Sequence, residues 1–382
     1  MRFFQRDSKR NVTTAHPLHS SCICSGNSHP REATRFHLRT WERKYQRCVR
    51  CKSLWVAEAL LSTCLLTSLA LQQDVSVLYN ITQTQMLNGV ITGSYYSSSF
   101  LTGTNGNQYI LLSHFLAASP SYFRGSLLDI TTSTYTNFFN HTSYPTNPSS
   151  TFNVSLNDGG FQSTSSNNVS TIRTWRTNAD VQYDLTFEAT SPILYNVGAG
   201  EFQWGTGLTN EWGIPAGKTT GTLQVNGSTI TIDPARSLTW YDRQWGPGFV
   251  VGNWTWFEFH LGPHGSTKVS VWAWDNLNPA GETHFATVRA PNGDHSVFSV
   301  TLTPSYTRSY TSSATNITYP LDWEITSPLG ETLFVSSFKA DQEIVGLAIS
   351  EHAYEGFVTT KGTFLNTIGD GFGLVEMVRT ID

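Results

Sequence analysis

The larger part of this chain lacks cysteine. Its five cysteines all lie at or before residue 64 of 382, at Cys22, Cys24, Cys48, Cys51 and Cys64. Residues 72–382 therefore have no disulfide and no thiol nucleophile. Their stability has to come from burial of an apolar core, and about 310 residues are enough for that.

Several catalytic motifs are also missing from these residues. The sequence has no glycine-rich phosphate loop after a strand, no G-x-S-x-G turn and no H-E-x-x-H. This makes phosphoryl transfer and redox-cofactor chemistry poor hypotheses, because both need recognisable binding loops. We expect no cofactor and no metal.

Charge is divided unevenly along the chain. Residues 1–71 hold 12 of the 24 Lys and Arg residues but only 4 of the 28 Asp and Glu residues, so residues 72–382 carry a net charge of −12. A surface of this sign repels phosphate backbones, and a nucleic-acid partner is therefore not expected. The difference in composition indicates that only the second part is a folded body.

Residues 47–70 have the order of a secretory signal. Arg47, Arg50 and Lys52 precede a leucine-rich run, and Ser68 and Ala70 form a small-x-small site. This order predicts cleavage after about Ala70 and a protein that is secreted or held in the secretory lumen. A membrane anchor is the alternative, but the apolar run is shorter than the roughly 20 residues that a spanning helix needs.

The extension before this signal, residues 1–46, is basic, and we assign it no fold. A cluster of possible zinc ligands begins in this extension and ends just after it. The spacing of these ligands matches no common zinc finger. The cluster is His16, His19, Cys22, Cys24, Cys48 and Cys51.

A secreted route makes N-glycosylation sequons relevant. About five would occur by chance in a body rich in Ser, Thr and Asn, so the count is only compatible with secretion. The seven predicted acceptors are Asn80, Asn140, Asn153, Asn168, Asn226, Asn253 and Asn316.

The sequence of residues 72–382 predicts an all-β fold. Helical periodicity is scarce, whereas β-branched and aromatic runs such as "QYILLSHFL", "VQYDLTFEA" and "NWTWFEFHL" recur between Gly, Asn, Pro and Asp. This spacing is typical of barrels or sandwiches. The dipeptide Asn226-Gly227 predicts a tight hairpin turn, because both residues accept positive φ.

The length of the body predicts two β domains. Gly246, Pro247 and Gly248 interrupt the strand pattern and indicate the joint. We therefore expect an N-terminal β domain at 71–247 and a C-terminal β-barrel domain at 248–382.

The stretch "TWYDRQW" places an acid and a base among aromatic residues. If it is a strand, Trp240, Asp242 and Gln244 share one face, and Tyr241, Arg243 and Trp245 share the other. The sequence leaves two hypotheses open for Asp242 and Arg243: a place at a reactive site, or a structural ion pair at the domain joint.

The next run, "NWTWFEFHL", alternates in the same way. Trp254, Trp256, Glu258 and His260 share one face. A glycan on Asn253 would put the start of the opposite face in solvent and turn this face inward. Two indoles, a carboxylate and an imidazole resemble the lining of a ligand cavity. Plain core packing is the alternative for the tryptophans, and Trp272 in "SVWAWD" repeats the theme.

Some other strands carry isolated polar residues, which are costly to bury without a partner. They are His114, Glu211, Asp341, Glu343 and Glu376. Among them, His114 in "LLSHFL" is the strongest candidate for a functional residue. The alternative is a core histidine whose hydrogen bonds are satisfied.

Together, "GAGEFQWGTGLTNEWGIPAG", "SLTWYDRQWG", "NWTWFEFHL", "FATVR", "YPLDWEI", "DQEI", "YEGFV" and "GFGLVEM" resemble a known family. It is the fungal family that unites kievitone hydratase and lipocalin-like Diels–Alderases, with carotenoid hydratases and AttH-like proteins as bacterial relatives. The resemblance covers nearly all of residues 75–380. It implies two lipocalin-like antiparallel β-barrel domains with a substrate pocket at or near their junction.

The resemblance also implies cofactor-free chemistry on an apolar polyene, prenylated, terpenoid or polyketide molecule, but it does not select the reaction. We place a Diels–Alder or hetero-Diels–Alder cyclisation first, with a hydratase or dehydratase as the alternative and a non-catalytic carrier as the second. A cyclase needs an orienting apolar cavity, and a hydratase needs a buried acid with a raised pKa and a base.

Asp242 and Glu258 are the expected acid and base. Arg243, Tyr241 and His114 are candidate donors to a substrate carbonyl. The predicted walls of the cavity are Trp240, Tyr241, Trp245, Trp254, Trp256 and Trp272.

Overall fold

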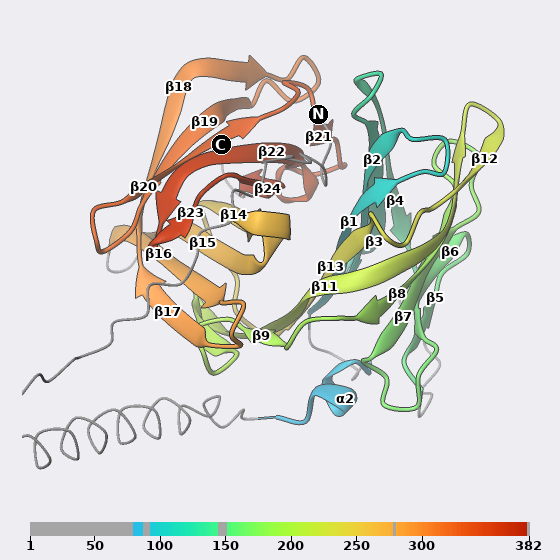
Figure 1. Ribbon diagram of the computed structural model, residues 1–382, viewed down its shortest axis with the longest axis horizontal. Helices are drawn as coiled ribbons and strands as arrows, with labels where there is room; N and C mark the ends of the chain where they lie inside the picture. The colour runs from blue at the N-terminus through green and yellow to red at the C-terminus, as the bar shows by residue number, and fades with distance from the viewer. Residues whose placement is uncertain (1–78, 87–91, 144–150, 278–279, 380–382) are drawn as a thin grey trace, which may run out of the picture. The chain divides into compact units, whose positions relative to one another are not determined.

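The computed structural model describes residues 79–86, 92–143, 151–277 and 280–379 (Figure 1). All of them belong to the compact unit that includes Asp74–Asp382. The predicted extension at 1–46, the predicted signal at 47–70 and the histidines and cysteines before residue 72 lie outside these residues.

The first sheet contains the strands from β1 to β13. They run β4-β3-β2-β1-β13-β11-β8-β7-β6-β5, and β9, β10 and β12 pair with the long strand β11. Their bounds are β1 Gly93–Thr102, β2 Gln108–Ala117, β3 Ser121–Asp129, β4 Thr134–Thr142, β5 Asn153–Ser155, β6 Gly159–Ser163, β7 Thr171–Arg176, β8 Tyr183–Ala189, β9 Leu194–Tyr195, β10 Glu201–Trp204, β11 Gly207–Val225, β12 Ser228–Thr231 and β13 Leu238–Trp245.

The second sheet contains the strands from β14 to β24. They run β17-β16-β15-β14-β24-β22-β20-β19-β18, and β21 and β23 pair with β22. Their bounds are β14 Asn253–Leu261, β15 Thr267–Leu277, β16 Ala280–Arg289, β17 His295–Ser299, β18 Thr301–Thr311, β19 Thr318–Thr326, β20 Thr332–Ser337, β21 Glu343–Ile344, β22 Ala353–Phe364, β23 Thr367–Ile368 and β24 Gly371–Arg379.

Each sheet is antiparallel and curls into a half-barrel (Figure 1). The chain passes from the first sheet to the second between Trp245 and Asn253. In the described residues, helix is limited to α2 at Ile81–Thr84 and the short 3-10 turns η1 at Pro263–Gly265 and η2 at Ile349–Glu351. The prediction of a two-part, lipocalin-like, all-β fold is confirmed.

Three apolar cores hold the sheets together. One lies on the inner face of the first half-barrel and contains Tyr95, Trp212 and Tyr241, and another lies within the second and contains Phe257 and Phe259. The third draws residues from both sheets, among them Trp240 and Trp256. We call the residues of this third core and the polar groups among them the inter-sheet layer.

Two local predictions can be compared directly with the structure. Asn226 and Gly227 form the two-residue turn between β11 and β12, with φ of 51° and 76°. Six of the seven predicted glycosylation sites are exposed, but Asn168 is only 4% exposed and its side chain accepts a hydrogen bond from the Phe152 N–H. In the folded chain Asn168 is therefore a poor site for attachment of a glycan. Glycosylation of the other six asparagines stays a prediction.

None of the helices in the described ranges combines the length and the apolarity that crossing a bilayer requires.

Candidate functional site

A row of side chains crosses the first sheet on the face that meets the inter-sheet layer. The strand register places Arg124 opposite His114, His114 opposite Tyr96, Tyr96 opposite Asp242 and Asp242 opposite Gly213. Directly opposed residues in antiparallel strands point to the same face. Four strands, β3, β2, β1 and β13, thus present a guanidinium, an imidazole, a phenol and a carboxyl group side by side.

A second row crosses the other sheet. Trp272 lies opposite Trp256, Trp256 opposite Glu376, and Glu376 opposite Glu355. The strands are β15, β14, β24 and β22. The second row therefore contributes two indoles and two carboxyl groups to the layer that the first row faces.

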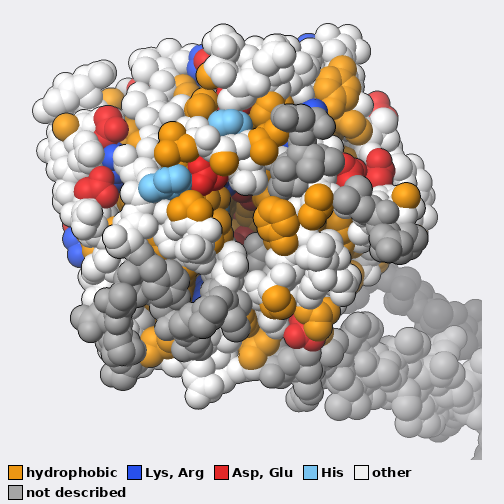
Figure 2. Space-filling model, turned by 180° about the vertical axis from the view of Figure 1, so that it is seen from behind, with side chains coloured by type: hydrophobic (Ala, Val, Ile, Leu, Met, Phe, Trp, Pro, Cys, Tyr) orange, Lys and Arg blue, Asp and Glu red, His pale blue; other side chains and the backbone are white. Residues whose placement is uncertain are grey.

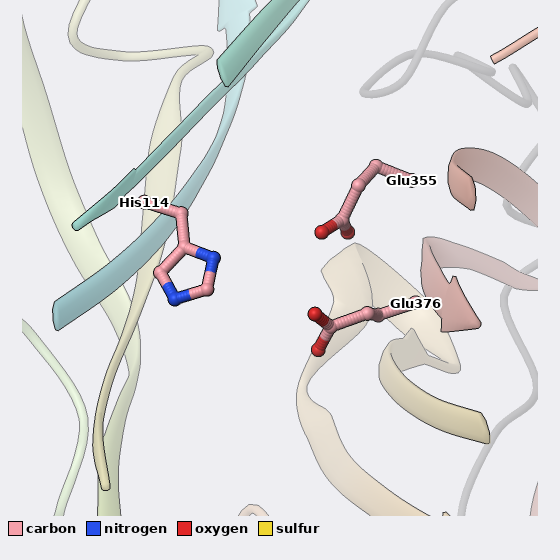
Figure 3. Close-up of side chains that lie close together, drawn as sticks. All are labelled: His114, Glu355 and Glu376. Atoms are coloured by element: carbon pink, nitrogen blue, oxygen red, sulfur yellow. The ribbon is translucent and has the colours of Figure 1, made fainter. Parts of the chain in front are cut away.

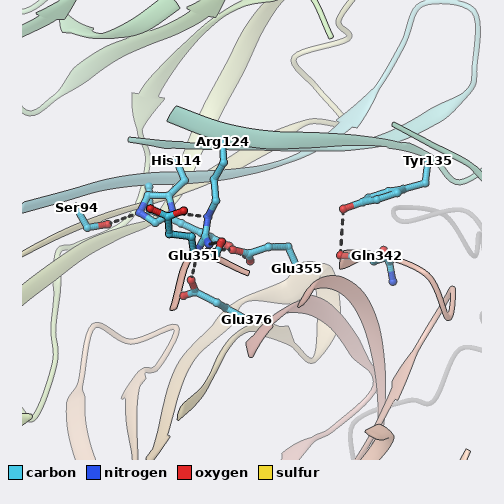
Figure 4. A network of polar contacts seen from close by, with 9 residues as sticks. Ser94, His114, Arg124, Tyr135, Gln342, Glu351, Glu355 and Glu376 are labelled. Carbon is cyan, nitrogen blue, oxygen red and sulfur yellow. Dashed lines mark hydrogen bonds and ion pairs between the residues drawn. The ribbon is translucent and has the colours of Figure 1, made fainter. Parts of the chain in front are cut away.

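Arg124 joins the two rows (Figure 4). Its Nη2 lies 2.6 Å from Glu376 Oε1 and 3.0 Å from Glu355 Oε1, and its Nε lies 3.0 Å from His114 Nδ1. Tyr96 donates its hydroxyl to Glu355 Oε2 at 3.1 Å. Arg124 is only 1% exposed, so these charge-assisted bonds form in a medium where they are strong.

The two glutamates share this single guanidinium. Burial raises the pKa of Glu355 well above its ordinary value, and the charge of Glu376 adds to the effect while Arg124 opposes it. Burial also raises the pKa of Glu376, against the influence of Arg124. Negative charge on one carboxyl group therefore favours the neutral form of the other.

His114, Glu355 and Glu376 form the one group of potential metal ligands found in the described residues, with ligand atoms within 4.8 Å of one another. Figure 3 shows His114 pointing from one sheet toward the two carboxyl groups of the other. The Arg124 guanidinium already binds all three. A protein cation thus occupies the position that a metal would take.

A cavity of about 390 Å³ adjoins this network. Its apolar walls include Trp204, Trp245, Trp254 and Trp272, and its polar lining includes Ser94, His114, Arg124, Gln244 and Glu376. Figure 2 shows a hollow bordered by hydrophobic side chains, with histidine and acidic side chains beside it. An apolar cavity with a few converging polar groups is typical of a small-molecule site.

Asp242 lies deeper in the inter-sheet layer and does not line this cavity. Its Oδ2 accepts the Trp240 Nε1–H at 2.7 Å, and its buried Oδ1 has no hydrogen-bond partner in the described part of the chain. Burial raises the pKa of Asp242 to about 8, with a smaller contribution from the charge of Glu376. Asp242 is therefore a protonated acid at neutral pH.

Glu211 and Glu258 complete a set of five buried carboxyl groups. Glu211 accepts the Trp272 Nε1–H at 3.3 Å, and Glu258 accepts the Ser98 hydroxyl. Burial raises the pKa of both well above the ordinary value, and the charge of Asp242 adds to it. The layer thus holds several buried carboxyl groups with raised pKa values beside indole rings.

Arg243 and Tyr241 lie on the opposite face of β13. Arg243 donates to the carbonyl oxygens of Thr84, Ser94 and Gln244, and its guanidinium lies 4.2 Å from the centroid of the Tyr95 ring. The ion pair between Asp242 and Arg243 that the sequence left open is wrong, because strand alternation separates the two side chains. Tyr241 donates to Gln85 and packs in the core of the first sheet.

The expected inward face of "NWTWFEFHL" is found, since Trp256, Glu258 and His260 are buried in the inter-sheet layer and Trp254 is partly buried there. The other face begins exposed at Asn253 and is buried further along the strand. Phe257 and Phe259 are fully buried in the core of the second sheet. Both faces of β14 are covered, because the strand lies between two cores.

Apart from Tyr241, the predicted cavity walls divide into two groups. Trp245, Trp254 and Trp272 line the cavity, whereas Trp240 and Trp256 are packed against each other in the inter-sheet layer, with ring centroids 6.3 Å apart. Ser94, Arg124 and Glu355 were not predicted from the sequence. The last two are isolated charges in "SYFRGSLLD" and "YEGFV", the same signal that identified His114 and Glu376.

Comparison with known proteins shows the family to which this chain belongs. The AttH-like family model matches residues 135–379, and the chain belongs to this family. It is 43% identical over 308 residues to the kievitone hydratase of Fusarium solani subsp. phaseoli, covering 80% of this chain and 87% of that protein. It is 37% identical over 311 residues to the dehydratase asqC of Emericella nidulans, covering 79% and 88%.

Solved structures agree. The crystal structure of kievitone hydratase from Nectria haematococca has a TM-score of 0.75 and 38% identity, covering 81% of this chain and 95% of that one. A candidate AttH from Nitrosomonas europaea has a TM-score of 0.68 at 16% identity, covering 80% and 98%, and shares the fold. The family is enzymatic, and the two relatives compared above are named as a hydratase and a dehydratase. They favour the alternative of the sequence analysis over the cycloaddition placed first.

Proposed function

We propose that this protein is a hydro-lyase that acts on an apolar, π-rich small molecule, using side chains alone. It adds water across a carbon–carbon double bond, or eliminates water from an alcohol to form such a bond. The observation that carries the proposal is the Arg124-bridged carboxyl pair at the edge of an indole-walled cavity. The relatives named a hydratase and a dehydratase support the same reaction class.

The proposed acid is Glu376, because it is the member of the pair that lines the cavity. Protonation of an alkene carbon requires a neutral carboxylic acid, and the raised pKa values of Glu355 and Glu376 keep a proton on the pair. Arg124 fixes both carboxyl groups in place.

The indole rings stabilise the positively charged intermediate. Protonation leaves a carbocation, and Trp254 and Trp272 line the cavity with indole rings, whose negative quadrupole stabilises such a charge. Water then forms a bond to this carbon, and the resulting oxonium returns a proton to the carboxylate that donated the first. Dehydration is the same sequence in reverse.

Asp242, Glu211 and Glu258 lie behind this pair and are coupled to it by charge. Their neutral state keeps the layer free of uncompensated negative charge. We therefore propose Glu376 at the reacting carbon, and Asp242 and Glu258 as acids that support the protonation state of the pair.

The test uses the substrate named for the 43% identical relative. The purified full chain is incubated with kievitone and the products are separated by high-resolution mass spectrometry. A product heavier by one water is the expected result. An isomer of unchanged formula would favour cyclisation, and quenching of tryptophan fluorescence without a product would favour the carrier. Unchanged, unbound kievitone would contradict the proposal for this substrate.

A further inference from the structure

The hydrogen positions of His114 are fixed by its neighbours. Arg124 Nε can only donate, and it lies 3.0 Å from His114 Nδ1, so Nδ1 is the acceptor. Burial and the charge of Arg124 lower the pKa of His114 well below its ordinary value, and the ring is neutral. Its single hydrogen is therefore on Nε2.

This hydrogen determines the direction of the next bond. His114 Nε2 lies 3.0 Å from Ser94 Oγ, and Nε2–H must donate to it. His114 therefore has no free lone pair with which to accept a proton, and the base role open to histidines does not suit it. Its place in the chain Arg124, His114, Ser94 is that of a positioning residue (Figure 4).

Ser94 ends this chain at the cavity. It is partly exposed and lines the cavity, and His114 is the only partner of its hydroxyl among the described residues. Since Ser94 Oγ accepts from His114, its own O–H points elsewhere. The Ser94 carbonyl accepts the Arg243 Nη1–H at 3.2 Å from the other side of the strand. Both ends of the residue are therefore held.

We propose that Ser94 is a catalytic residue that binds the reacting oxygen: its O–H donates to the water that is added and, in the reverse direction, to the hydroxyl that leaves. The proposal rests on the hydro-lyase function proposed above. It gives Arg243 a positioning role through the backbone of Ser94, which explains why a cation on the opposite face of β13 adjoins the site.

The step balances without a proton from Ser94. Water uses one lone pair to accept the Ser94 O–H and the other to form the C–O bond. The oxonium then gives one proton to the Glu376 carboxylate, which restores the acid consumed when the alkene was protonated. In dehydration the C–O bond breaks after protonation of the hydroxyl, and Ser94 retains the departing water.

The experiment compares Ser94→Ala, Ser94→Thr and Ser97→Ala with the wild-type chain. Ser97 is the matched control, because it lies on the opposite face of the same strand and its buried hydroxyl finds no hydrogen-bond partner within the residues that the structure describes. With kievitone, Ser94→Ala is expected to lower kcat about tenfold to a hundredfold with little change in KM, as for the loss of one oriented donor. Ser94→Thr should restore most of kcat, and Ser97→Ala should leave it unchanged.

A structural readout separates this proposal from the proposed function. Crystal structures of the wild type and of Ser94→Ala are compared for an ordered oxygen within hydrogen-bond distance of Ser94 Oγ on the cavity side. Its presence in the wild type and loss in the variant support the proposal even if kievitone is not converted, a result that would contradict the proposed function alone. Unchanged kcat in Ser94→Ala, or no ordered oxygen on Ser94, overturns the role of Ser94.

Discussion

Asp242 shows how a single buried side chain couples the site to pH. Its ordinary pKa is 3.8, and burial raises it to about 8 in the folded chain. Between these values the folded chain keeps a proton that the unfolded chain releases. Its contribution to stability is therefore complete below about pH 4 and is lost as the pH rises through about 8.

Replacement of Asp242 by Asn removes this dependence. We expect the unfolding free energy of Asp242→Asn minus that of the wild type to increase as the pH rises from 4 to 8. The increase is at most about 1.4 kcal/mol for each pH unit. Urea unfolding of both proteins across this range measures the difference. A difference that is constant or shrinks with pH would mean that Asp242 is ionised in the folded chain.

Residue-scale reasoning found much of the site from the sequence. His114, Glu211 and Glu376 were recognisable because an isolated polar side chain in an apolar strand needs a partner or a function. Arg124 and Glu355 carry the same signal. Arg124 was missed because "SYFRGSLLD" has no clear period-2 pattern: all nine residues of β3 are buried, since both of its faces meet a core.

At the scale of the strand, alternation determines which side chains reach the site. β13 delivers Trp240 and Asp242 to the inter-sheet layer, and Tyr241 and Arg243 to the other side. The sequence was sufficient to predict this division, but not to predict which face meets the second sheet. The contact between Gly213 of β11 and Asp242 of β13 was also not predictable. A Cβ on Gly213 would lie 2.4 Å from Asp242 Oδ1.

This contact predicts a coupling between two neighbouring strands. Gly213→Ala should lower the unfolding free energy by about 1–3 kcal/mol, because the buried Asp242 carboxyl group has to move. In an Asp242→Ala background the same change should cost much less, since the clashing oxygen is gone. A double-mutant cycle by urea unfolding measures this coupling. Equal costs in both backgrounds would show that Gly213 serves the backbone and not Asp242.

At the scale of the whole molecule, the site exists because two half-barrels contribute complementary rows. The first supplies Arg124, His114 and Ser94, and the second supplies Glu355 and Glu376. From the sequence we expected a pocket near the junction, with Asp242 and Glu258 at its centre. Arg124 and Glu355 lie 231 positions apart in the chain. No local pattern connects such residues, and their meeting depends on how the two sheets pack.

The measurement that tests the account most directly is the source of the added oxygen. The chain is incubated with kievitone in water enriched in a heavy oxygen isotope, alongside Glu376→Gln and the exposed control Glu324→Gln. We predict a product with one labelled oxygen, formed about 10²- to 10⁴-fold more slowly by Glu376→Gln and at an unchanged rate by Glu324→Gln. An unlabelled product, or full activity of Glu376→Gln, would contradict water addition driven by the Arg124-bridged carboxyl pair.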